Sequence, residues 1–249
     1  MKEAIYTIPV NEAFEADCAC PFCYLSSKLE AETISYTLGA SMMEPDARSI
    51  TNQQGFCAKH FAQLLALPNK LSLALVLESH LEDVRKRIDI CQANITASSE
   101  SKKNSLFSRS KQTSSVTNAT MLSNILKGIG ATCAVCAKID ATMQRYLDVF
   151  FYLWVNDSGF RKNFDSKEGF CLQHYQLLVS ESCEFLKDKQ QSEFLKNIYE
   201  KQQKSLAALQ QDIHHFTLKF DYRNSDMPWG NAQDAPQRLI EKLTGPLEK

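Results

Sequence analysis

The chain has 249 residues, of which 44% are hydrophobic and 23% charged, and its formal net charge is −1. This composition is that of an ordinary globular protein, long enough for one large domain or two small ones. A near-neutral charge excludes strong attraction of the whole chain to nucleic acid or to an anionic membrane. The nine cysteines are numerous for this length.

Nothing at the N-terminus resembles a signal peptide, because residues 1–9 lack an apolar core. No stretch approaches the roughly 18–20 consecutive apolar residues that a membrane helix needs. We therefore expect a cytoplasmic protein without membrane contact. In that reducing compartment, many cysteines favour metal ligation or thiol chemistry over structural disulfides.

Helical periodicity runs along most of the chain. Apolar side chains recur every three or four residues over 25–36, 73–91, 139–154 and 195–220. The last of these segments is close to a heptad seam, with Gln202 as its one polar member. No alternating strand pattern extends beyond residues 6–10, so the predicted fold class is all-α.

Two short motifs occur twice, in the same order. Each copy has a Cys-x-x-Cys pair followed by Gly-Phe-Cys-x-x-His, with 33 residues between Cys23 and Cys57 and 34 between Cys136 and Cys171. Such a recurrence indicates an internal repeat. We predict a first module at residues 1–92, a flexible Ser/Lys-rich linker at 93–120, a second module at 121–220 and a C-terminal tail with a short helix at 221–249. The linker is expected because its composition offers little apolar surface to bury.

Each copy offers three thiols and one imidazole, the ligand set of a closed tetrahedral zinc site. A two-residue gap lets both side chains of each motif reach one ion, and a helix N-terminus favours the thiolate. We expect one ion per copy, and hence two per chain. The predicted ligands are Cys20, Cys23, Cys57 and His60 in the first copy and Cys133, Cys136, Cys171 and His174 in the second.

Zinc is the metal we expect, because closed sites of mixed Cys and His ligands favour it. An iron–sulfur cluster on the same residues is the alternative cofactor. Dithiol redox chemistry of the Cys-x-x-Cys pairs is a further alternative, although the βαβ pattern that usually surrounds such a redox motif is missing.

The remaining cysteines and histidines lie outside the two motifs. Cys18 could be an alternative ligand, a thiol that exchanges with Cys20, or a plain exposed cysteine. Cys91 and Cys183 lie in helical patterns, and we expect them in the core. His80 and the pair His214 and His215 are expected to be structural.

The tail contains several aromatic and charged residues. We expect Tyr222 and Trp229 to hold it against the body of the protein, with Asp221 and Arg223 as a surface pair. A recognition surface is the alternative. Asp234 is expected to cap the final short helix.

Several segments together resemble an uncharacterised bacterial protein family. They are residues 6–14 (YTIPVNEAF), 146–154 (YLDVFFYLW), 220–223 (FDYR) and the duplicated metal motifs. Members of that family are sometimes labelled ABC transporter substrate-binding proteins. The label implies an exported protein with two α/β lobes, whereas we expect no signal peptide here and an all-helical fold.

No catalytic pattern accompanies the metal motifs: the chain has no P-loop, dinucleotide fingerprint or Ser/His/Asp arrangement. We therefore assign no catalytic residue. The leading hypothesis is a non-catalytic zinc protein that binds a protein partner. A thiol-redox or iron–sulfur enzyme or sensor is the first alternative. A nucleic-acid-binding zinc protein is the second, supported only by Lys102, Lys103, Arg109 and Lys111.

Overall fold

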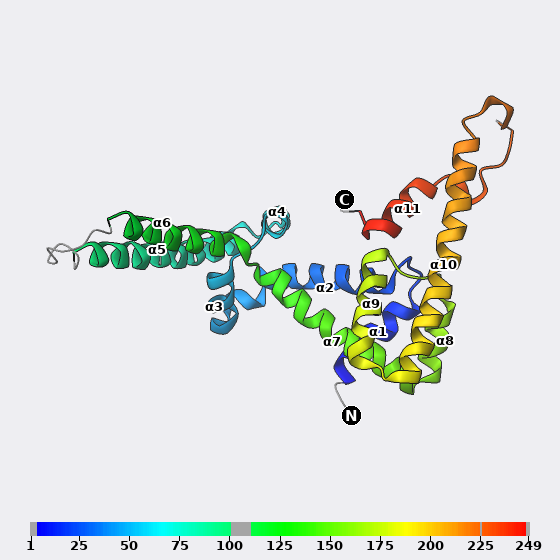
Figure 1. Cartoon of the computed structure of the whole chain (residues 1–249), viewed down its shortest axis with the longest axis horizontal. Helices are drawn as coiled ribbons and strands as arrows, with labels where there is room; N and C mark the ends of the chain where they lie inside the picture. The colour runs from blue at the N-terminus through cyan, green and yellow to red at the C-terminus, as the bar shows by residue number, and fades with distance from the viewer. Residues whose placement is uncertain (1–3, 101–110, 225, 248–249) are drawn as a thin grey trace. The chain divides into compact units, whose positions relative to one another are not determined.

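The computed structural model describes residues 4–100, 111–224 and 226–247. Within these ranges the chain forms eleven α-helices and three short 3-10 helices, and it has no strand (Figure 1). The predicted all-α class is therefore confirmed. The 3-10 helices are η1 (Ala40–Met43), η2 (Tyr222–Asn224) and η3 (Gly230–Ala232).

The chain divides into two compact units. Unit 1 comprises Met1–Lys28 and Ala141–Lys249, and unit 2 comprises Leu29–Asp140. The chain passes from one unit to the other within α2 (Pro21–Thr37) and again within α7 (Ala134–Asn156). Each unit thus combines residues from both of the predicted modules at 1–92 and 121–220, and the compact units do not follow those boundaries.

Unit 1 is built around buried aromatic side chains. Its helices are α1 (Ala4–Glu15), α8 (Ser158–Ser166), α9 (Leu172–Phe185), α10 (Asp188–Leu218) and α11 (Ala235–Thr244), with the start of α2 and most of α7. Phe14, from α1, lies 5.4 Å from Phe150 and 4.9 Å from Phe160 between ring centroids. Close aromatic pairs of this kind add to the free energy gained by burying the rings.

A side-chain cap sets the start of α8 in unit 1. The Asp157 carboxylate accepts hydrogen bonds from the backbone N–H groups of Gly159 and Phe160, which caps the start of α8.

The buried side of α10 contains Phe194, Ile198, Gln202 and Leu209. Gln202 is the polar member of this side, as predicted, whereas Tyr199, an aromatic residue within the predicted segment 195–220, is exposed.

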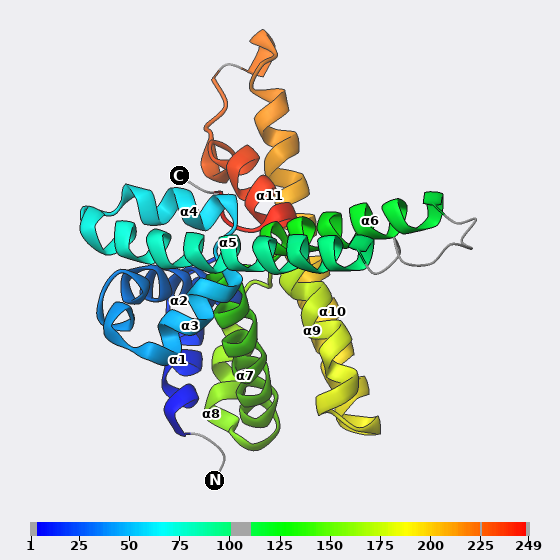
Figure 2. The ribbon, with the colours of Figure 1, turned by 90° about the vertical axis from the view of Figure 1, so that its left-hand side faces the viewer.

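Unit 2 contains α3 (Pro45–Gln54), α4 (Ala58–Ala66), α5 (Lys70–Glu100) and α6 (Lys111–Ala131), with the end of α2 and the start of α7. Helices α5 and α6 run side by side in both ribbon views (Figure 2). The unit has an aliphatic core with one buried phenylalanine; its members include Ile34, Leu38, Phe56, Leu64, Leu73, Val76 and Val135.

The segment predicted as a flexible linker, residues 93–120, is different in the structure. Helix α5 continues to Glu100 and α6 begins at Lys111, while residues 101–110 lie outside the described part of the chain. The physical reason is that most of a helix's stability comes from packing against a neighbour rather than from its own composition. Here α5 and α6 are each other's neighbour.

No single helix in the described residues is long and apolar enough to cross a membrane. One pair of consecutive helical segments, Ala119–Ala131 and Ala134–Asn156, meets the length and composition criteria only when taken together, and the two are bent by 62°.

Candidate metal centres

The eight predicted ligands all lie at helix N-termini. Backbone bonds to the carbonyls of Cys20, Cys57, Cys133 and Cys171 open α2, α4, α7 and α9, with N···O distances of 2.8–3.1 Å. In each motif the first ligand is therefore the residue before the helix, and the second is the third residue within it. This local geometry, fixed by the two-residue spacing, directs both side chains off the same helix end.

In unit 1, the start of α2 meets the start of α9. The Sγ atom of Cys23 lies 3.5 Å from that of Cys171 and 3.3 Å from His174 Nδ1. Cys20 Sγ lies 4.0 Å from Cys171 Sγ and 3.6 Å from His174 Nδ1, and Cys171 Sγ lies 3.2 Å from the same nitrogen. We call this group the unit 1 site.

In unit 2, the start of α4 meets the start of α7. His60 Nδ1 lies 3.1 Å from the Sγ atoms of both Cys57 and Cys133, and 3.4 Å from that of Cys136. The sulfurs of Cys57 and Cys136 are 4.0 Å apart. A backbone hydrogen bond of 3.0 Å from the Ala134 N–H to the Gly55 carbonyl joins the two loops. We call this group the unit 2 site.

The predicted composition of the cages is wrong, although each predicted ligand belongs to a Cys₃His group. Cys20 and Cys23 do not meet Cys57 and His60, and Cys133 and Cys136 do not meet Cys171 and His174. Instead, each Cys-x-x-Cys pair meets the Cys-x-x-His pair of the other copy.

Apolar packing beside the ligands explains the exchange. Phe22, between the first two cysteines, lies 6.1 Å from Phe170, which precedes Cys171. Val135, between the other two cysteines, shares a core cluster with Phe56, which precedes Cys57. Because burying these side chains is favourable, each Cys-x-x-Cys is drawn to the partner whose phenylalanine it packs against.

Both groups fit a tetrahedral zinc ion. With Zn–S bonds of about 2.3 Å and Zn–N bonds of about 2.0–2.1 Å, two sulfurs lie about 3.8 Å apart and a sulfur and a nitrogen about 3.5 Å apart. In the two groups, the distances range from 3.5 to 4.0 Å between sulfurs and from 3.1 to 3.6 Å between sulfur and nitrogen. The sulfurs are too far apart for disulfide bonds, which need about 2.05 Å.

The unit 2 site has a carboxylate behind its histidine. Glu30 Oε1 lies 2.9 Å from His60 Nε2, on the opposite side of the imidazole from the sulfurs, and 2.9 Å from Lys59 Nζ. With the ring proton on Nε2, His60 donates to Glu30 and leaves Nδ1 free to bind a metal. Such an arrangement fixes the tautomer and the orientation of a metal-binding histidine.

A glycine precedes the phenylalanine of each Cys-x-x-His loop and adopts a positive φ. The values are 60° for Gly55 and 131° for Gly169, a region that other residues rarely enter. A Cβ at Gly55 would lie 2.6 Å from the His80 ring, and one at Gly169 would lie 2.9 Å from Gln202 Oε1. These two glycines allow the close approach that places the ligands.

Hydrogen bonds among the unit 1 ligands shift the pKa values of three of them. Hydrogen bonds from Cys20 and Cys23 lower the pKa of the Cys171 thiol, while the hydrogen bond to Cys171 raises the pKa of Cys23. Burial opposes a charge on His174, but hydrogen bonds to the Cys171 and Cys20 sulfurs outweigh it and raise its pKa to about 9. A metal ion must therefore displace protons to bind here.

In the unit 2 site, burial and hydrogen bonds among the thiols raise the pKa of Cys136 to about 12. Burial alone would raise the pKa of Cys57, but hydrogen bonds from the backbone at the start of α4 and from Cys133 and Cys136 together outweigh it and lower this pKa. Each site thus has one thiol whose pKa its neighbours lower, Cys57 in the unit 2 site and Cys171 in the unit 1 site.

The other cysteines and histidines stay outside both groups. Cys18 Sγ lies 3.7 Å from the Ala13 carbonyl, and Cys91 is buried as predicted. The prediction that Cys183 lies in the core is wrong: Cys183 is exposed and accepts a hydrogen bond from Gln191 on the same surface. His214 and His215 join no ligand group.

The tail agrees with its prediction in part. Trp229 packs against Phe216 with a centroid distance of 5.6 Å, and Asp221 pairs with Arg223 at 2.6 Å. Tyr222 does not hold the tail down, since 86% of its surface is exposed. Asp234 precedes α11 as predicted, but its carboxylate accepts from Arg238 Nε rather than from a backbone N–H group.

A family model described as "Family of unknown function (DUF6062)" matches residues 1–249. The chain belongs to this family. No curated protein and no solved structure matches it. Membership in the family thus brings no function with it, and the chemistry of the two sites has to be argued from their own geometry.

Proposed function

We propose that this protein is a non-catalytic helical scaffold, that two structural zinc ions stabilise it, and that it acts by binding a protein partner. The observation that carries the proposal is the pair of Cys₃His groups, each with ligand spacings that suit a tetrahedral ion. Four protein ligands fill such a site, which leaves no position for water or substrate, and closed sites of this kind serve structure.

The choice of zinc rests on the donor set. Three thiolates with one imidazole are a frequent zinc environment, whereas iron–sulfur clusters usually take four cysteines. The Glu30 carboxylate behind His60 supports a metal-binding imidazole in the unit 2 site.

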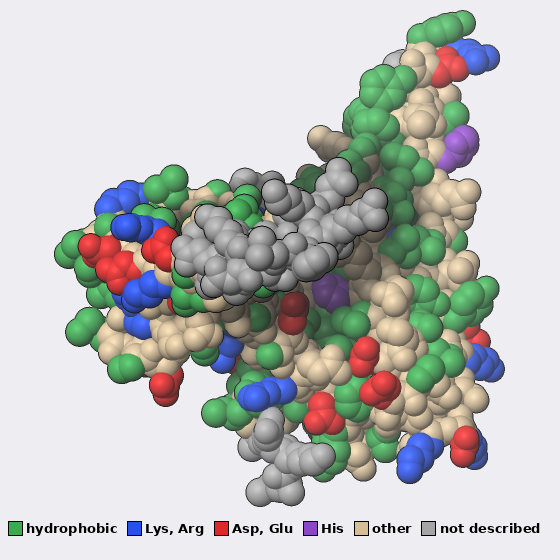
Figure 3. Space-filling view, turned by 60° about the vertical axis from the view of Figure 1, so that its left-hand side comes forward, with side chains coloured by type: hydrophobic (Ala, Val, Ile, Leu, Met, Phe, Trp, Pro, Cys, Tyr) green, Lys and Arg blue, Asp and Glu red, His purple; other side chains and the backbone are tan. Residues whose placement is uncertain are grey.

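A protein partner is supported by apolar side chains that the chain itself leaves uncovered. Figure 3 shows hydrophobic side chains at the end of α10 and the segment after it. Phe220 and Tyr222 there are 75% and 86% exposed. Exposed aromatic side chains gathered in this way are typical of protein interaction sites. The basic residues Lys102, Lys103 and Arg109, which suggested nucleic acid, lie outside the described residues.

Elemental analysis of the purified protein, together with an absorption spectrum, tests the metal assignment. We expect two zinc ions per chain and no visible absorbance, and we expect Cys57→Ser and Cys171→Ser each to lose one ion. Cys183→Ser is the matched control, because Cys183 is exposed and belongs to neither group. Visible absorbance together with bound iron would indicate an iron–sulfur cluster in place of zinc. Metal-free protein with a reversible disulfide would overturn the proposal in favour of thiol chemistry.

A further inference from the structure

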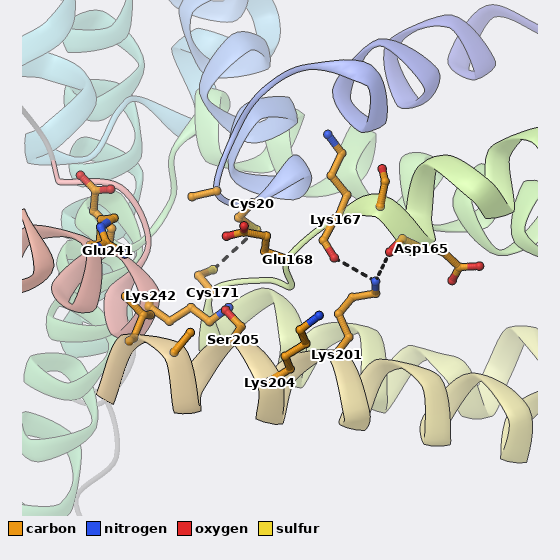
Figure 4. Close-up of a pocket in the computed structure, with 15 residues that line it drawn as sticks. Cys20, Asp165, Lys167, Glu168, Cys171, Lys201, Lys204, Ser205, Glu241 and Lys242 are labelled. Atoms are coloured by element: carbon orange, nitrogen blue, oxygen red, sulfur yellow. Dashed lines mark hydrogen bonds between the residues drawn. The ribbon is translucent and has the colours of Figure 1, made fainter. Parts of the chain in front are cut away.

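A cavity of about 430 Å³ lies within unit 1, beside the metal ligands Cys20 and Cys171. Its walls come from α10, from α11, from the end of α8 and from the loops that precede α2 and α9 (Figure 4). This volume exceeds what a single small ion needs and falls within the range of cavities that hold small molecules.

Four lysines line the cavity, and none of them forms an ion pair with a carboxylate in the described residues; they are Lys167, Lys201, Lys204 and Lys242. The one arginine of the wall, Arg238, differs from them because it pairs with both Asp212 and Asp234. The lysines therefore account for the positive charge that remains available to a ligand.

Three of the ammonium groups face the hollow. Lys201 and Lys204 are less than one turn apart on α10, and Lys242 reaches in from α11 (Figure 4). Lys201 donates to the backbone carbonyls of Asp165 and Lys167, and Lys204 has no hydrogen-bond partner among the residues that the structure describes. The fourth, Lys167, instead donates to the Ala16 carbonyl.

Lys242 is unusual because only 8% of its surface is exposed. A buried ammonium group has three N–H donors and is costly to bury without partners. Its one hydrogen bond goes to the Ser205 hydroxyl at 2.8 Å. Burial lowers its pKa, while the nearby Cys20, Cys171 and Glu168 act in the opposite direction. Two of its three N–H donors thus have no hydrogen-bond partner among the described residues, in a side chain that lines the cavity.

Acidic groups also face the hollow and set the kind of anion that fits. The carboxylates in the wall are Asp165, Glu168 and Glu241. Two of them already accept hydrogen bonds, Asp165 from Asn197 and Glu241 from Gln237. A ligand must therefore be compact at its charged end, to reach the ammonium groups without meeting these carboxylates. A tetrahedral phosphate group satisfies this condition and accepts several hydrogen bonds from lysine.

We propose that this cavity binds a phosphate group, either as free phosphate or as the charged end of a small organic phosphate, through Lys201, Lys204 and Lys242. The proposal goes beyond the structural role of the metals and does not depend on it. The volume left around one phosphate group would accommodate the organic part of such a ligand.

Isothermal titration of the full chain, purified with its metals, tests the proposal with inorganic phosphate and with glycerol 3-phosphate as probes at constant ionic strength. We expect saturable binding of at least one probe, with tighter binding of glycerol 3-phosphate if the organic source is the right one. Lys204→Gln should weaken binding about tenfold, since it removes one charged donor. No saturable binding of either probe below about 10 mM would overturn the proposal.

Lys196→Gln is the matched control, because Lys196 is an exposed lysine of the same helix that does not line the cavity. It should bind the probes as the unchanged protein does, and an equal loss in both variants would overturn the proposal by indicating a general effect of surface charge. Metal content is measured on every sample, so that a failure of the zinc assignment appears separately from a failure of phosphate binding.

Discussion

At the residue scale, the two sites differ in what supports their histidines. His60 has Glu30 behind its ring, at 2.9 Å from Nε2, whereas the face of the His174 ring lies near Phe22, with 5.7 Å between ring centroids. A carboxylate behind a metal-binding imidazole strengthens the ligand and fixes its direction. The unit 2 site therefore depends on a residue that belongs to neither metal motif and that no local sequence pattern identifies.

Replacement of this carboxylate gives a prediction for one site only. Glu30→Gln should weaken metal binding in the unit 2 site by about 10- to 100-fold, because such outer partners commonly contribute that much. Competition with a chelating dye measures the loss. The unit 1 site in the same protein is an internal control, and Glu32→Gln, at an exposed position on the same helix, is a second one. Equal weakening of both sites would contradict the role given to Glu30.

The unit 1 site should release metal as the pH falls. Because the pKa of His174 in the metal-free site is raised to about 9, this imidazole is protonated at neutral pH and must lose its proton to bind a metal. The apparent affinity should therefore be highest above about pH 9 and should decrease at each lower pH, with further loss as the thiols retain their protons. Zinc titrations of the Cys57→Ser variant, which has only the unit 1 site intact, measure this. An affinity that does not change between pH 6 and 8 would contradict it.

At the element scale, the loop before α9 is held by α10. The buried Gln202 side chain donates to the Phe170 carbonyl at 3.0 Å and accepts from the Phe170 N–H at 3.2 Å. It thereby satisfies both backbone groups of the residue that precedes Cys171, next to Gly169 with its positive φ. The polar residue in an otherwise apolar seam thus positions a metal ligand. Its place in the seam follows from periodicity, whereas its partner is visible only in the structure.

Gln202→Leu tests this link between α10 and the site. The substitution keeps a similar volume but leaves two buried backbone groups without partners, so it should lower the free energy of unfolding by about 1–3 kcal/mol. Urea unfolding of the metal-loaded protein measures the change. The neighbouring Gln203→Leu is the control, because Gln203 is exposed and should change stability by less than about 0.5 kcal/mol. Similar losses in both variants would contradict the role of the buried amide.

At the scale of the whole molecule, local and long-range features were predictable to different degrees. The eight ligands and the helical class follow from short spacings, such as that of Cys20 and Cys23, which any local fold preserves. Which ligands share one site does not follow from the short spacings, because each Cys-x-x-Cys pair could meet either of two equivalent Cys-x-x-His loops. The choice depends on which phenylalanine, Phe56 or Phe170, each pair packs against, and that contact joins residues far apart in the chain.

With the ligands exchanged in this way, an ion bound at either site would join the N-terminal to the C-terminal part of the chain. Both sites take one motif from before residue 61 and one from after residue 132. A chain cut by a protease at a site inserted between residues 101 and 110 should therefore remain one particle in size-exclusion chromatography, and a strong chelator should weaken the association of its fragments. Two fragments that separate at once, each with its own ion, would contradict the exchanged arrangement.

The most direct measurement of the central claim is the metal content of two double variants, compared by elemental analysis. Cys23→Ser with His174→Ala alters only the unit 1 site in this structure, and Cys23→Ser with His60→Ala alters both sites. We expect the first double variant to retain one zinc ion per chain and the second to retain none. The opposite result, no ion in the first and one in the second, would place the ligands of each copy together and contradict this account.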